Sequence, residues 1–202
     1  MTVALESDAR KILSPMREGK IRSAFERAWT DWLESPERAK YSRWARTRAN
    51  MVFERIAVRL LEAFADDRGV RFHFQDETIK IIFDKLLLVR CKKANERGLG
   101  GNVPTQANMA FCEAQSDLPG LPGLQKIEIV YLLNDTATAI ENIVVQARDG
   151  DMRLWAYTLG GIEDGGASIV PLRPSSPPPS YDPADIVNPR QPTERDEESD
   201  ED

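Results

Sequence analysis

Apolar residues recur every three or four positions in the first part of the chain. This spacing places them on one stripe of a helix from about residue 17 to residue 34. The stripe consists of Ile21, Phe25, Ala28, Trp29, Trp32 and Leu33. Because the fold must cover such a stripe, Trp29 and Trp32 are predicted to be buried. The helix ends at Ser35, since a residue before proline avoids helical dihedral angles.

The same spacing predicts a second helix from about Tyr41 to Asp66. Its apolar face is centred on Val52, Ile56 and Leu60. After Gly69 the period of the apolar pattern changes to two, the period of a half-buried strand. Six strands are therefore expected, at residues 70–74, 78–83, 85–92, 126–133, 140–147 and 152–158.

A short helix is expected between the third and fourth strands, at residues 104–112, because Pro104 fits the first turn of a helix. The first three strands are separated by very short gaps, so they pair as antiparallel hairpins. Asp149-Gly150 is a strong hairpin signal between the last two strands. The order ααβββαβββ predicts an α+β fold, with the helices on one face of a mostly antiparallel sheet of about six strands. Residues 1–160 would form this single globular domain.

The composition changes after residue 160. Residues 161–202 hold 11 acidic and 3 basic residues together with eight of the 13 prolines. Residues 1–160 hold 24 basic against 22 acidic residues, so the net charge of −6 arises in the last 42 residues. Such a segment buries too little apolar surface to offset the entropy of ordering it, and we expect a disordered acidic tail. The tail either keeps the protein in solution or masks a basic surface.

The two cysteines, Cys91 and Cys112, lie in apolar settings and do not form a CxxC motif. They are expected to be free thiols in a reducing compartment. The first residues carry charges throughout, unlike a signal peptide, and no run of about 18 apolar residues suggests a membrane span. These features indicate a cytoplasmic protein without a membrane partner.

Several kinds of chemistry are excluded by the residue inventory. His73 is the only histidine, so neither a histidine metal cluster nor a histidine-dependent triad is expected. The glycines match neither a P-loop nor a dinucleotide-binding fingerprint. No cofactor, metal or catalytic residue is predicted.

Two basic segments are the candidate binding residues. The first places five cations beside Tyr41 and Trp44: Arg38, Lys40, Arg43, Arg46 and Arg48. It is typical of a phosphate-contacting surface, or else of a charged helix face with one packed tryptophan. The second, residues 90–106, combines cations with three glycines and the start of a helix. Glycine amides and a helix N-terminus can bind an anion; the alternative is a solvated strand end followed by a flexible turn. The candidate contacts are Arg43, Arg46, Arg90, Lys92, Lys93, Arg97, Asn102, Thr105 and Gln106.

A nuclease is the alternative function. Asp84 precedes the strand that carries Lys92, in the rough outline of the restriction-endonuclease core. That chemistry requires a second carboxylate two residues before the lysine, and Arg90 stands there. A nuclease or toxin using Asp84, Lys92, Lys93 and Arg97 would therefore have a degenerate core. Two carboxylates close to Lys92 in the fold would favour it.

Residues 26–160 resemble a widespread uncharacterised family of bacterial and phage genomes. The resemblance lies in KLLLVRCKKANERGLGGNVPTQANMAF, LPGLP, IEIVYLLND and VVQARDGDMRLWAYTL. Genes of that family neighbour helix-turn-helix regulators, so the resemblance implies a small regulator as partner, as in a toxin–antitoxin or phage-control pair. It implies no activity. The leading hypothesis is thus a non-catalytic interaction or regulatory protein acting with a DNA-binding regulator.

Overall fold

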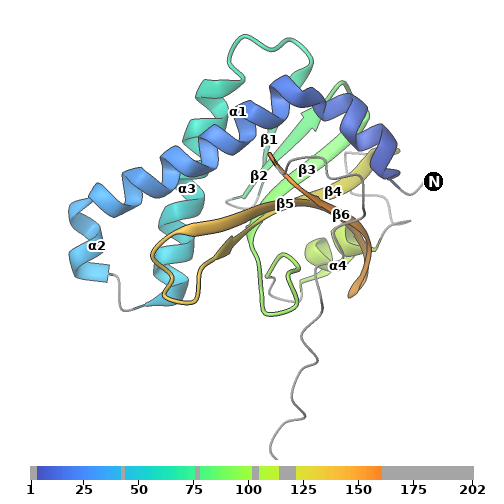
Figure 1. Cartoon of the computed structure of the whole chain (residues 1–202). Helices are drawn as coiled ribbons and strands as arrows, with labels where there is room; N and C mark the ends of the chain where they lie inside the picture. Colours follow the sequence, from blue (N-terminus) through green and yellow to red (C-terminus); the bar gives the residue numbers. More distant parts are fainter. Residues whose placement is uncertain (1–3, 42–43, 76–77, 102–104, 114–121, 161–202) are drawn as a thin grey trace, which may run out of the picture. The chain divides into compact units, whose positions relative to one another are not determined.

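A computed structural model describes residues 4–160 except 42–43, 76–77, 102–104 and 114–121 (Figure 1). The expected acidic tail lies outside the described residues. The helices are α1 (Glu6–Glu34), α2 (Pro36–Tyr41), α3 (Ala45–Ala63) and α4 (Gln106–Cys112). The strands are β1 (Val70–Gln75), β2 (Thr78–Phe83), β3 (Leu87–Lys93), β4 (Gln125–Leu133), β5 (Ile140–Asp149) and β6 (Met152–Thr158). This α+β fold confirms the predicted class and nearly every predicted element.

The first helix is longer than the sequence predicts. It begins at Glu6 and is interrupted at Ser14, whose φ of 48° and ψ of 154° are not helical. The interruption has a local cause, since Ser14 precedes Pro15 and a residue before proline is excluded from the helical region. The part after the interruption carries the predicted stripe. Trp29 and Trp32 are buried, as predicted.

The second predicted helix begins too early. Residues 36–41 form the separate helix α2, which starts at Pro36, a residue suited to a first helical turn. Helix α3 starts only at Ala45, with Trp44 as its N-cap residue. Its buried positions Val52, Ile56 and Leu60 are the predicted face.

The six strands form one sheet in the order β1-β2-β3-β4-β5-β6. All neighbours are antiparallel except β3 and β4, which run parallel and are connected through the segment that contains α4. Side chains alternate between the two faces of the sheet. Leu87, Val89 and Cys91 of β3 join the core beneath α1 and α3.

Helix α4 packs on the other face of the sheet. Its Phe111 contacts Leu88, which points away from the main core, and Ile82 of β2 packs beside them. The expectation that the helices occupy one face is therefore wrong for α4. The sequence pattern does not show which face of the sheet α4 covers. A helix of seven residues has a single apolar turn, which could pack on either face. In the described part of the chain, no helix has the length and apolar character needed to cross a bilayer.

Candidate nucleic-acid interface

The two basic segments of the sequence meet where α3 begins and β3 ends. Arg48 of α3 lies close enough to Lys93 of β3 for its charge to act on the lysine pKa. The ammonium of Lys92 lies 5.8 Å from the ring centroid of Phe53, which is also on α3. We call Trp44, Arg46, Arg48, Lys92 and Lys93 the α3–β3 basic surface.

The positive charges of this surface are not neutralised. Burial lowers the pKa of Lys92, and the charge of Arg90 lowers it further, while the carboxylate of Glu128 acts in the opposite direction with a smaller effect. Burial likewise lowers the pKa of Lys93, with Arg48 adding to the effect. Among the residues that the structure describes, Lys92, Lys93 and Arg48 have no ion-pair partner. Partly buried cations that repel each other, as Lys93 and Arg48 do, are costly in the free protein, and a bound anion would reduce that cost.

Trp44 adds an aromatic ring to the surface. Its side chain is 69% exposed, although tryptophan is normally among the more buried residues. It stands one helical turn before Arg48, whose backbone N–H donates to the Trp44 carbonyl at 3.0 Å. The alternative of a packed tryptophan on a charged helix face is wrong, because the ring is open to solvent. Arg46, between these two residues, is also exposed.

Arg90, a predicted contact, is instead part of a buried ion pair. Its side chain is 5% exposed and that of Glu128, opposite it on β4, is 0% exposed. The Arg90 Nε donates to Glu128 Oε1 at 2.9 Å. The remaining guanidinium nitrogens reach Asn108 and Cys112 of α4, and the guanidinium carbon lies 3.9 Å from the centre of the Phe111 ring. Arg90 therefore ties α4 to the sheet and does not face a ligand. Cys91 and Cys112 are buried and form no disulfide, as expected.

Glu128 is the residue that sequence reasoning missed. Burial alone would raise its pKa, but Arg90 and then Arg148 outweigh burial, and the pKa of Glu128 is lowered. Its Oε2 accepts the Gly100 N–H at 3.1 Å and the Gln146 amide at 3.2 Å. With both oxygens engaged, this carboxylate is not open to a metal ion. The sequence does contain a signal for it: Glu128 is a single acidic residue within the apolar run Ile127-Glu128-Ile129-Val130, which indicates a buried carboxylate that needs a partner.

The backbone amides of the glycine-containing loop after β3 form hydrogen bonds within the protein. The N–H of Gly98 donates to the Asn95 carbonyl, and that of Gly101 donates to the Lys93 carbonyl. Gly100 donates to Glu128, and a Cβ there would lie 3.0 Å from a Glu128 oxygen, so a larger residue would require the Glu128 side chain to shift. All three amides are thus used within the protein. The expectation that they approach an anion is wrong for this loop.

The other predicted contacts lie elsewhere. Arg97 is exposed and pairs with Asp151 at 3.5 Å. Thr105 caps α4, its Oγ accepting the Asn108 N–H at 3.3 Å, and Gln106 is exposed at the start of that helix. Arg43 and Asn102 lie outside the described residues. Of the predicted set, Lys93 lies near Arg48 and Lys92 near Phe53 of α3, while Arg46 is exposed on α3 two residues before Arg48.

The nuclease residues are not assembled. Asp84 lies in the β2–β3 turn with a φ of 51°, where Arg17 pairs with it at 2.7 Å and with Asp67 at 2.9 Å. Lys92 lies near the opposite end of β3, roughly 16 Å along the strand from Leu87. Within the described ranges, no group of three histidine, cysteine or acidic side chains could hold a metal ion.

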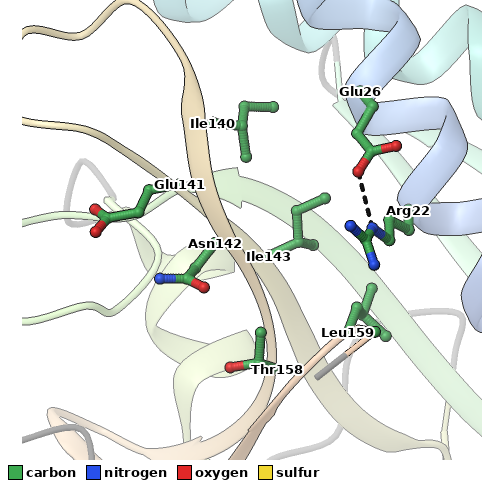
Figure 2. A pocket seen from close by; sticks show the side chains of 9 residues that line it. Arg22, Glu26, Ile140, Glu141, Asn142, Ile143, Thr158 and Leu159 are labelled. Carbon is green, nitrogen blue, oxygen red and sulfur yellow. Dashed lines mark hydrogen bonds and ion pairs between the residues drawn. The ribbon is translucent and has the colours of Figure 1, made fainter. Parts of the chain in front are cut away.

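A separate pocket of about 240 Å³ lies between α1 and strands β5 and β6 (Figure 2). None of the predicted contact residues lines it. Figure 2 shows its one cation, Arg22, beside Glu26, and the two form an ion pair at 2.8 Å. The pocket therefore lacks the excess positive charge of the α3–β3 basic surface.

Comparisons of this chain with protein-family models, with curated proteins and with solved structures find no match. The function must therefore be argued from the residues themselves.

Proposed function

We propose that this protein is a non-catalytic interaction protein that binds nucleic-acid phosphates on its α3–β3 basic surface. The observation that supports this most directly is that cations without ion-pair partners among the described residues come from both α3 and the end of β3: Arg48 acts on Lys93, and Lys92 lies 5.8 Å from the Phe53 ring of the same helix. The cost of holding these charges together is repaid by a bound polyanion. The family resemblance adds a helix-turn-helix regulator as the partner with which the protein would act on DNA.

Phosphate is the anion that best fits this group. Arg48 offers a planar fork of donors, and the two lysines offer point charges, the combination that proteins use for phosphate backbones. A ligand made only of carboxylates would leave the exposed Trp44 ring unused. The enzymatic alternative lacks support, since the carboxylate nearest in register to Lys92, Glu128, is occupied by Arg90 and Arg148.

The first test removes the two lysines. The double variant Lys92→Ala/Lys93→Ala is expected to bind a labelled oligonucleotide more weakly than the full-length protein. Each lost phosphate contact should flatten the dependence of log affinity on log salt by about 0.7–0.9, or about 1.4–1.8 for both. Fluorescence anisotropy across a series of salt concentrations measures both quantities.

The matched control is Lys11→Ala/Lys85→Asn, which removes the same charge from exposed positions. Asparagine is chosen at residue 85 because it tolerates the positive φ of 58° found there. This control should retain the salt dependence of the wild type. Equal affinities and slopes in the two double variants would contradict the proposal.

Removing the acidic segment after residue 162 is expected to strengthen nucleic-acid binding. Its 11 acidic and 3 basic residues give it a net charge near −8, tethered to a body near +2. Tethered carboxylates compete with phosphates for the same cations at a high effective concentration. The gain should shrink as salt rises. A shortened chain that melts within a few degrees of the full chain and binds no better would show that the segment does not mask the surface.

A further inference from the structure

The exposed ring of Trp44 indicates which kind of nucleic acid the surface binds. We infer that the α3–β3 basic surface takes a single-stranded nucleic acid, with one unpaired base stacked on the indole of Trp44 and the adjoining phosphates held by Arg48, Lys92 and Lys93. This inference rests on the proposed function and specifies its ligand.

An exposed indole offers a flat apolar face. Such a face binds the flat face of another ring, and in nucleic acids the faces of paired bases are already covered by their neighbours in the stack. Only an unpaired, splayed-out base presents a free face to a side chain. A duplex would offer Trp44 only sugars and base edges, and the ring would contribute little.

The distances along α3 fit one nucleotide and its neighbour. Trp44 and Arg48 are four residues apart, about 6 Å along a helix axis, and positions four apart share one side of a helix. The residue with the stacking ring and the first cation are therefore one helical turn apart, and their backbones are joined by a hydrogen bond. Lys93 of β3 lies close enough to Arg48 for the two charges to interact, so cations from both elements are available to the phosphates.

Within the described residues, the cations that we assign to phosphates are Arg48, Lys92 and Lys93, which makes a short footprint. Three clustered charges contact about three phosphates, which predicts a salt slope near −2 for a single strand. Proteins that grip duplex DNA through its backbone distribute cations along the helix and show steeper slopes. The described surface is the kind that combines a short cationic track with an aromatic platform.

The test uses the full-length protein with two probes, an oligothymidine of about 12 nucleotides and a duplex of equal length. Trp44→Ala is expected to weaken oligothymidine binding by about 5- to 150-fold, the range measured for losing one base-stacking contact. Duplex binding should change by less than about twofold. Trp44→Phe should restore most of the single-strand affinity, because the phenyl ring still stacks.

The outcomes separate the two proposals. Single-strand binding that depends on both Trp44 and the two lysines supports the inference. Binding that depends on Lys92 and Lys93 but favours the duplex, or ignores Trp44→Ala, overturns the single-strand inference and leaves the phosphate-binding surface standing. Absence of binding to either probe at low salt overturns both. Because Trp44 is exposed, its variants should melt like the wild type, which excludes misfolding as the cause.

Discussion

Glu128→Gln is expected to destabilise the protein by about 3–5 kcal/mol, although the two side chains have nearly the same shape. The substitution removes the only negative charge of a buried group that contains Arg90 and Arg148, whose side chains are almost wholly covered. Arg148 keeps the exposed Asp151 at 3.2 Å, but Arg90 is left without a counter-charge away from water, which is costly. Chemical denaturation at neutral pH, read from the midpoint and slope, measures the loss.

The matched control is Glu141→Gln, since Glu141 is exposed on β5 and the change should cost little. Acid adds a second measurement. The pKa of Glu128 is lowered in the fold, so its stabilising contribution is present above its ordinary value of 4.5 and is lost as pH falls through the folded value. The variant should lack that part of the acid dependence. A loss below about 1 kcal/mol, with unchanged acid dependence, would mean that Arg90 and Arg148 do not depend on this carboxylate.

Trp29→Ala is expected to cost about 3–5 kcal/mol, the usual range for truncating a buried aromatic side chain. The Trp29 ring is nearly covered, and its Nε1 donates to the Thr138 carbonyl at 3.0 Å, so the variant loses both packing and a hydrogen bond that connects α1 to the β4–β5 connection. Urea denaturation monitored by circular dichroism measures the change in free energy.

Trp44→Ala is the control of the same chemistry at an exposed position, where the change should stay within about 0.5 kcal/mol. Equal effects of the two substitutions would show that the helical stripe does not form the core.

Periodicity predicts the elements of this fold but not all of their neighbours. Spacings of 3.6 and 2 report which side chains of an element are covered, and they locate the later part of α1, α3 from Ala45 onward and all six strands. They do not report which strand lies beside which. The parallel pairing of β3 and β4 and the side chosen by α4 depend on residues far apart in sequence. The first turns of α1 were missed because Ala9 and Leu13 are too short an apolar pattern.

Only part of the candidate site could be predicted from the sequence, because the sequence shows which cations are clustered but not which face of the sheet they reach. Lys92, Lys93 and Arg46 could be identified because clustered cations are visible in the sequence. Arg90 belongs to the same run but points to the face that α4 covers, so its burial follows from tertiary packing alone. The approach of Arg48 to Lys93 likewise requires the fold.

The parallel junction of β3 and β4 divides the sheet into two hairpin meanders, residues 70–93 and 125–158, each continuous in sequence. Each half can form through local contacts, so the slow step in assembling the sheet should be the docking of one half onto the other. Arg90 and Glu128 are direct partners across that junction. Sliding β4 by one residue would set Ile127 or Ile129 against Arg90 and turn every β4 side chain to the wrong face. We therefore expect the buried ion pair to favour one alignment of the two halves, whatever it contributes to the stability of the finished protein.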